Sequence, residues 1–149
     1  MISKSCKYAI RAAVFIASKT RDNVKLGVKE IATEIEAPAP FTGKILQTLN
    51  KNKIVTSLKG PYGGFYCEPQ QLDLSVMQIV NAIDGENVFR ECVMGLHTCS
   101  DAHPCPMHHK VSETQDRMLQ SFKETSIRSL AEELIAGSAF VTNRDLGIE

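Results

Sequence analysis

The order of the predicted elements in the first 67 residues constrains the fold of this chain more than any other feature. Apolar residues recur at three- and four-residue spacing in three short segments, which predicts helices over 6–19, 28–36 and 40–52. Two β-prone runs, 54–59 and 65–67, then flank a cluster of glycine and proline, which predicts a hairpin. Three short helices followed by a two-stranded hairpin are the element order of a winged helix-turn-helix.

The rest of the chain is predicted to be helical around one irregular loop. Ser75 predicts the N-cap of a fourth helix, and residues 86–106 show neither a helical nor a strand period. A longer helix is predicted over 107–124. Ser129 predicts the N-cap of a last short helix, which we expect to end at Gly137.

The predicted fold is therefore mostly α-helical with a small β-hairpin wing. No apolar run approaches the ~20 residues of a membrane helix, and the start lacks the apolar stretch of a signal peptide. We therefore expect a cytoplasmic chain with no membrane partner. The expected parts are a winged helix-turn-helix domain over 1–85, a cysteine-rich loop over 86–106, a long and a short helix over 107–137, and a tail over 138–149.

The net charge of zero hides a division of the chain into a basic and an acidic part. Residues 1–60 hold eleven Lys/Arg against four Asp/Glu, a charge of +7, and residues 61–149 hold six against thirteen, a charge of −7. A basic part favours a polyanion as partner. A single polar helix face is by itself usually only a solvated surface. Interpreting the basic part as a DNA-binding surface therefore depends on its charge, the order of its helices and the hairpin together.

The third predicted helix presents an outward face without carboxylates. In a winged helix-turn-helix this helix enters the major groove, and the hairpin lies along the backbone or enters the minor groove. The predicted DNA-contacting residues are Thr42, Lys44, Gln47, Thr48 and Lys51 of the helix, and Lys59, Gly60, Tyr62, Gly63 and Gly64 of the hairpin turn.

The side chains that can bind metal gather in the irregular loop and just after it. Cys92, Cys99 and Cys105 are separated by six and five residues, and His108 follows one helical turn later. The other histidines of this region, His97, His103 and His109, are less favoured as a fourth ligand. Three thiols and an imidazole can fill the four positions around an iron–sulfur cluster or a zinc ion. The wide spacing, without a C-x-x-C pair, favours iron–sulfur; zinc and redox-active thiols stay open. The other two cysteines, Cys6 and Cys67, are expected to be small buried apolar residues.

The chain resembles bacterial winged-helix transcription regulators of the IscR/NsrR type, which sense iron–sulfur status or nitric oxide. The resemblance covers nearly the whole chain to about residue 136. The matching motifs are Tyr8-Ala-Ile-Arg11, Lys29-Glu-Ile-Ala32, Ile45-Leu46 with Leu49, Ile54-Val-x-Ser57, Lys59-Gly60, Gly63-Gly64-Phe65, Val80-x-Ala-Ile-Asp-Gly85 and the three-cysteine loop.

This resemblance implies a homodimer held by the long helix, in which each subunit binds one half-site of a near-palindromic operator in double-stranded DNA, as a repressor. It also implies a [2Fe-2S] or [4Fe-4S] cluster on the three cysteines, with a histidine at the position of His108 as fourth ligand. The nitric-oxide-sensing members instead use a carboxylate from the first helix of the partner subunit, and the corresponding stretch here, Ser5-Cys-Lys-Tyr8, holds none. Two positions depart from the family: the first cysteine interval is six rather than five residues, and Lys59 replaces a common arginine.

Two other classes of function use the same cysteines. One is a small redox or cluster-delivery protein, which leaves the basic part unexplained. The other is a zinc-stabilised interaction module. An enzyme is not expected, because no catalytic Ser/His/Asp order, phosphate-binding loop or pair of carboxylates stands out.

Overall fold

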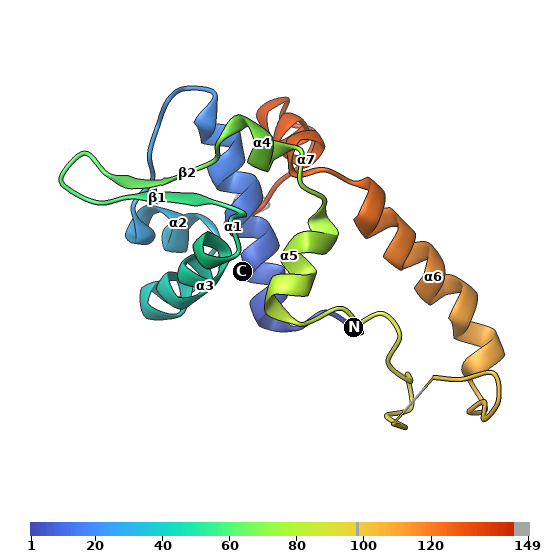
Figure 1. Cartoon of the computed structure of the whole chain (residues 1–149). Helices are drawn as coiled ribbons and strands as arrows, with labels where there is room; N and C mark the ends of the chain where they lie inside the picture. Colours follow the sequence, from blue (N-terminus) through green and yellow to red (C-terminus); the bar gives the residue numbers. More distant parts are fainter. Residues whose placement is uncertain (98, 145–149) are drawn as a thin grey trace.

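A computed structural model describes residues 1–97 and 99–144 of the chain. Its elements follow the predicted order, with one short helix added (Figure 1). They are α1 (Lys4–Thr20), α2 (Val28–Glu34), α3 (Ala39–Lys51), β1 (Thr56–Leu58), β2 (Gly64–Tyr66), α4 (Pro69–Leu72), α5 (Val76–Ile83), α6 (His108–Glu124) and α7 (Ile127–Ile135).

The main core forms around α1, whose buried face is rich in alanine. Small side chains let the neighbouring helices approach closely, and α7, α5 and α3 all pack against α1. Ile16, Ile31, Leu46 and Ile79 are fully buried in this core. Ile127 of α7 is fully buried there as well, so the last helix packs with the winged-helix elements rather than with α6.

The predicted hairpin forms as two short antiparallel strands. Thr56 pairs with Tyr66 and Leu58 pairs with Gly64. Phe65 also exchanges two backbone hydrogen bonds with Leu26, of 2.8 and 3.0 Å, so the segment before α2 adds a third partner to the wing. This contact fixes the wing relative to α2.

A second, smaller core joins α5, the start of the cysteine loop and α6. Val88 and Phe89 are buried against Met77 and Val80 of α5. The ring of Phe89 meets that of Phe122 on α6 edge to face, with 4.9 Å between centroids. From this contact α6 extends away from the main body toward the cysteine loop (Figure 1). No helix within residues 1–97 and 99–144 has the length and apolar character to span a bilayer.

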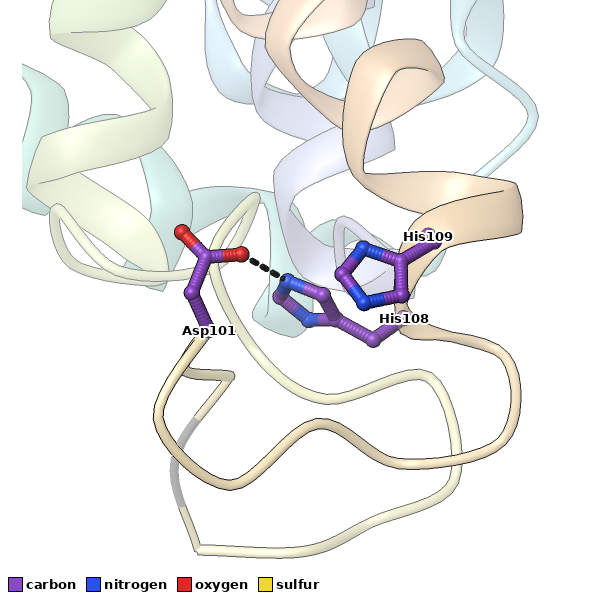
Figure 2. A group of neighbouring side chains, drawn as sticks. All are labelled: Asp101, His108 and His109. Atoms are coloured by element: carbon purple, nitrogen blue, oxygen red, sulfur yellow. Dashed lines mark hydrogen bonds and ion pairs between the residues drawn. The ribbon is translucent and has the colours of Figure 1, made fainter.

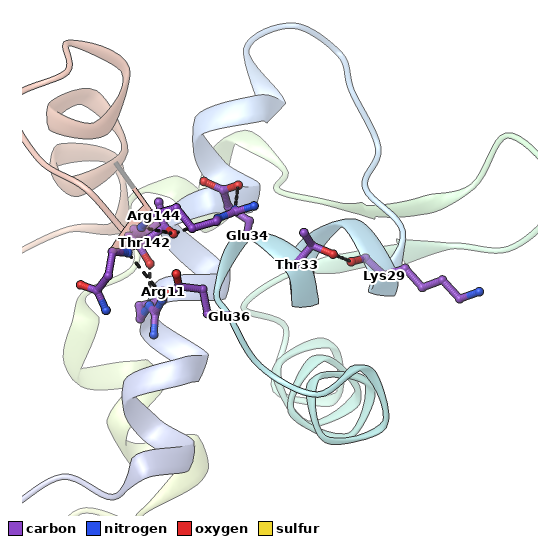
Figure 3. Close-up of polar contacts among 9 residues, drawn as sticks. Arg11, Lys29, Thr33, Glu34, Glu36, Thr142 and Arg144 are labelled. Carbon is purple, nitrogen blue, oxygen red and sulfur yellow. Dashed lines mark hydrogen bonds and ion pairs between the residues drawn. The ribbon is translucent and has the colours of Figure 1, made fainter. Parts of the chain in front are cut away.

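The C-terminal segment is held against α1 and α2 by polar contacts as far as Arg144. Arg11 Nε of α1 donates to the Val141 carbonyl at 2.6 Å, and its guanidinium lies 3.4 Å from the Glu36 carboxylate. Arg144 pairs with Glu34 at 2.6 Å (Figure 3). No sequence pattern predicts structure in the tail over 138–149; up to residue 144 it is ordered by these contacts, and residues 145–149 lie outside the described part of the chain.

The N-cap of α7 differs from the predicted one. Ser126, not Ser129, is the N-cap, and its hydroxyl oxygen accepts a hydrogen bond from the Ser129 N–H at 3.1 Å. We expect Ser126→Ala to lower the free energy of unfolding by about 1 kcal/mol, since an unsatisfied amide remains at the helix start. Ser129→Ala keeps the Ser126 cap and removes only the hydrogen bond from the Ser129 hydroxyl to the Ser126 carbonyl, of 2.8 Å, so it is the matched control in urea unfolding. If Ser129→Ala lowered the free energy of unfolding as much as Ser126→Ala or more, Ser129 would be favoured as the N-cap, as the sequence predicted.

Candidate nucleic-acid interface and metal centre

The outward face of α3 carries most of the predicted base-contacting side chains. Lys44, Gln47 and Lys51 are exposed, and Thr48 is half-buried with its hydroxyl donating to the Lys44 carbonyl at 3.2 Å. Pro40 stands in the first turn, where its missing N–H costs nothing, and the helix buries Ile45, Leu46 and Leu49 on the other side. The helix therefore presents a basic, hydrogen-bonding strip to the outside.

The expectation that Thr42 lies on this outward face is wrong. Thr42 is fully buried, and its hydroxyl donates to the Pro38 carbonyl one turn earlier, at 3.0 Å. It stands three and four residues before Ile45 and Leu46, so helical spacing places it on the apolar stripe. The hydrogen bond to the Pro38 carbonyl satisfies the Thr42 hydroxyl inside the core. Thr42 is therefore a core residue and is removed from the predicted base contacts.

The turn of the wing is exposed at its tip. Lys59, Gly60 and Tyr62 are all exposed, and Tyr62 reaches 91% exposure. The two glycines that follow are required by the wing itself. A Cβ on Gly63 would lie 2.0 Å from the Leu58 carbonyl oxygen, and Gly64 has φ +143° with the Leu26 backbone 2.8 Å from where its Cβ would be.

The lysines of α3 and the wing are free to meet an external anion. Among the residues that the structure describes, none of Lys44, Lys51, Lys53 and Lys59 forms an ion pair. The ion pairs in that part of the chain involve Arg11, His108, Arg117, Arg128 and Arg144, away from the α3 strip and the wing tip.

The cysteine loop turns its ligand-type side chains inward and its apolar side chains outward. Cys92 is 8% exposed, Cys105 9% and His108 6%, whereas Val93 and Met94 are more than half exposed. An ordinary loop of this kind would bury the apolar side chains and leave the polar imidazole in water. The inversion indicates that the thiols and the imidazole, not an apolar core, organise this loop.

One short contact and two pKa shifts connect the four predicted ligands. Cys99 Sγ lies 3.1 Å from His108 Nδ1. The pKa of Cys92 is lowered by the backbone N–H groups of Leu96 and Met94 and by a hydrogen bond with Cys105. The pKa of Cys99 is raised, first by burial and then by the nearby Cys92 and Cys105 thiols. The three thiols and His108 therefore lie in one neighbourhood.

Two further groups reach this neighbourhood: the Asp101 carboxylate, which the sequence did not single out, and the imidazole of His109, a less favoured alternative to His108. Asp101 Oδ1 lies 2.7 Å from His108 Nε2, and His109 stacks edge to face on His108 (Figure 2). Ligand atoms of Asp101, His108 and His109 all lie within 4.8 Å of one another. Asp101 was missed because the only signal is a carboxylate two residues after a cysteine, which is common without any role.

The donor set fits an iron–sulfur cluster. Thiolates and one imidazole are cluster ligands, and backbone N–H groups directed at the Cys92 sulfur stabilise an anionic sulfur. His108 is also the first residue of the 17-residue helix α6, and a helix N-terminus favours a group with net negative charge. The other two histidines of the region, His97 and His103, are exposed.

The remaining two cysteines are the buried apolar residues that the sequence predicted. Cys6 is fully buried in the smaller core and Cys67 is 2% exposed after β2. Burial raises the pKa of both thiols to about 12. Neither thiol is close to forming a thiolate at neutral pH, which is the form that binds metal.

The three-helix arrangement, the basic face of α3 and the paired wing define a winged helix-turn-helix protein. Residues 2–133 match the family Rrf2, described as iron-dependent transcriptional regulator, and the chain belongs to this family of transcriptional regulators. DNA binding follows from membership of the family.

The relatives and structural neighbours agree with this assignment. A protein of Aquifex aeolicus, whose name describes an HTH-type transcriptional regulator, is 31% identical over 132 residues, covering 87% of this chain and 90% of its own. The structure of CymR, the global cysteine regulator of B. subtilis, matches with a TM-score of 0.68 at 18% identity, covering 93% of this chain and 98% of CymR. IscR of T. potens matches with a TM-score of 0.68 at 15% identity, covering 93% and 91%.

These comparisons confirm two predictions from the sequence. The resemblance to regulators of the IscR/NsrR type is confirmed, and the relatives are transcriptional regulators rather than enzymes. At identities below 20%, the two solved structures show the shared winged-helix fold and nothing about what this chain binds.

Proposed function

We propose that this protein is a homodimeric, sequence-specific repressor whose affinity for double-stranded DNA is controlled by an iron–sulfur cluster on Cys92, Cys99, Cys105 and His108. The observation that carries the proposal is the burial pattern of the cysteine loop, in which three of these four side chains are buried while neighbouring apolar residues are exposed. The cluster would supply iron bonds to the four side chains and so order a loop that has little core of its own.

On the DNA side, α3 supplies the base contacts and the wing supplies backbone contacts. Lys44, Gln47 and Thr48 face the major groove, where the glutamine amide matches the donor and acceptor of adenine. Lys51 meets phosphates at the end of the helix. In the wing, Lys59 and Gly60 to Gly64 lie against the adjacent backbone, with Tyr62 at the exposed tip.

The spacing of the donors favours a cluster over a single zinc ion. Zinc requires all four donors about 2.3 Å from one ion, so the donors themselves would lie about 4 Å apart. Among the described residues, the group whose ligand atoms all lie within 4.8 Å of one another contains His108 but none of the thiols. The three thiols and His108 therefore do not all converge on one point, which is the arrangement that a single zinc ion needs.

The start of the loop is connected to α6 and, through the end of α5, to α1 of the DNA-binding domain. Phe89, just before Cys92, packs on Phe122 of α6, and Gln115 of α6 donates to the Glu91 carbonyl at 3.0 Å. Asp84, at the end of α5, accepts a hydrogen bond from the Ser3 N–H at 2.7 Å at the start of α1. A change in the loop therefore reaches α6, the proposed dimer helix, and α1. Half-sites lie ~34 Å apart, so a small tilt of the two domains costs affinity.

Anaerobic purification with a visible spectrum, followed by selection of bound DNA with and without the cluster, tests this proposal. We expect a brown protein that selects a near-palindromic site, with an affinity that changes when the cluster is removed. A colourless protein that contains zinc would favour the zinc-stabilised module. Failure to bind any duplex, loaded or stripped, would contradict the proposal as a whole.

We also expect operator affinity to fall steeply with salt. Each phosphate neutralised by a lysine contributes about −0.9 to the slope of log affinity against log salt concentration. Lys51→Ala should reduce the magnitude of that slope by about 1, as measured by fluorescence anisotropy between 50 and 200 mM salt, roughly the range over which such contacts are resolved. Lys123→Ala, on α6 away from α3 and the wing, is the matched control. A slope near zero for the native chain would contradict the phosphate contacts.

A further inference from the structure

His108 lies between two partners that occupy its two ring nitrogens. Nδ1 is 3.1 Å from Cys99 Sγ, and Nε2 is 2.7 Å from Asp101 Oδ1. Figure 2 shows the Asp101 carboxylate directed at the ring from the loop, while His108 itself begins α6. The imidazole is almost entirely buried, with 7% of its side chain exposed.

The chemistry of these two contacts decides which nitrogen carries the proton. An ionised carboxylate only accepts hydrogen bonds, so Nε2 is the donor to Asp101. A neutral imidazole has one N–H, which leaves Nδ1 with a free lone pair. That lone pair faces Cys99 Sγ, and the Cys99 thiol is in turn near Cys92 and Cys105.

We propose that Asp101 is a positioning residue that holds His108 as the Nε2–H tautomer and presents Nδ1 as the ligand atom for the cluster. This inference rests on the proposed function, because His108 is the fourth ligand there. A carboxylate that accepts the second ring N–H of a metal-bound histidine fixes its tautomer and orientation and makes it a more basic ligand.

The Asp101 side chain is 91% exposed, so the backbone of its own turn and the burial of His108, rather than packing around the carboxylate, set the orientation of the pair. The Asp101 segment is a tight turn, in which the His103 N–H donates to the Ser100 carbonyl at 3.2 Å and the Ala102 N–H donates to the Ser100 hydroxyl at 3.1 Å. The His109 ring meets that of His108 edge to face, with 4.9 Å between centroids. A flipped His108 ring would lose the hydrogen bond to Asp101.

The first part of the test uses the metal-free protein and therefore does not depend on a cluster. Long-range ¹H–¹⁵N correlation of ¹⁵N-histidine-labelled protein at pH 8 reports the tautomer of His108, whose signal is assigned by its loss in His108→Gln. We expect the Nε2–H form in the native chain and a mixture in Asp101→Ala. Asp116→Ala is the matched control, because this carboxylate also lies near Cys99 but forms no hydrogen bond with His108. A native Nδ1–H tautomer would overturn the proposal.

The second part measures how firmly the reconstituted cluster is held. The EDTA concentration that removes half of the cluster should fall about tenfold in Asp101→Ala and change less than about twofold in Asp116→Ala. Asp101→Glu should recover most of the loss. In a His108→Cys background, the Asp101→Ala change should have no effect, because a cysteine has no ring N–H for Asp101 to accept.

The outcomes separate this inference from the proposed function. An equal loss of cluster on Asp101→Ala in both backgrounds would overturn the inference, since Asp101 would then be a ligand itself or a general support of the loop. A native chain that holds no cluster would overturn the proposed function and the ligand assignment together. The tautomer measured without metal would still decide whether Asp101 orients the ring.

Discussion

The Cys99→Ala chain is expected to hold no stable iron–sulfur cluster after anaerobic reconstitution. Cys99 is the thiol in direct contact with His108 Nδ1, at 3.1 Å, and its pKa responds to both of the other loop thiols. Removing its sulfur leaves three donors for a centre that needs four. Iron and sulfide content and the visible spectrum measure the loss, and the DNA affinity of the variant should equal that of the cluster-free native protein.

The matched control for this substitution is Cys67→Ala, the same change at a buried thiol beside the wing. Cys67 is 2% exposed, and its backbone N–H donates to the Thr20 hydroxyl at 3.0 Å. The control should keep full cluster occupancy and lower the free energy of unfolding by about 1 kcal/mol, since it leaves a small cavity. Full occupancy in Cys99→Ala would contradict the ligand assignment.

Local patterns in the sequence were sufficient for the winged-helix part of the fold. Each of the first three helices has its own apolar period, and Gly27 and Pro40 mark where α2 and α3 begin. Helix α4 was not predicted, because four residues are too few for a period. Its capping box also starts at Glu68 rather than at one of the residues preferred at an N-cap. The N-cap of α7 was predicted three residues too late, because Ser126 and Ser129 are both of a residue type that is acceptable at an N-cap.

The candidate sites were less predictable where contacts between distant segments decide them. The error at Thr42 could have been avoided, since its spacing from Ile45 and Leu46 already places it on the buried stripe. The pairing of Asp101 with His108 could not be predicted in this way. The loop between them has no period, and its path is set by side-chain contacts rather than by local preference. Residue types alone therefore identified the four candidate ligands but not the carboxylate that we propose orients one of them.

Gly63→Ala should disrupt the wing while leaving the helical core folded. The new Cβ would lie 2.0 Å from the Leu58 carbonyl oxygen and within 2.9 Å of two further backbone carbons. These atoms belong to the strand and turn of the wing and cannot move without opening the Leu58–Gly64 pair. We expect a loss of about 1–3 kcal/mol in the free energy of unfolding. Operator affinity should fall about tenfold or more, because Lys59 is no longer held against the backbone.

The matched control is Gly43→Ala on α3, where the added Cβ meets only a Val28 methyl at 3.8 Å, an ordinary contact. Alanine is favoured over glycine inside a helix, so this variant should gain about 0.5–1 kcal/mol and keep its operator affinity. Urea unfolding and operator titration of both variants separate the two effects. Since Gly63→Ala alters no charge, a normal affinity in that variant would mean that the wing contributes little to binding. The DNA contacts would then have to come from α3 alone.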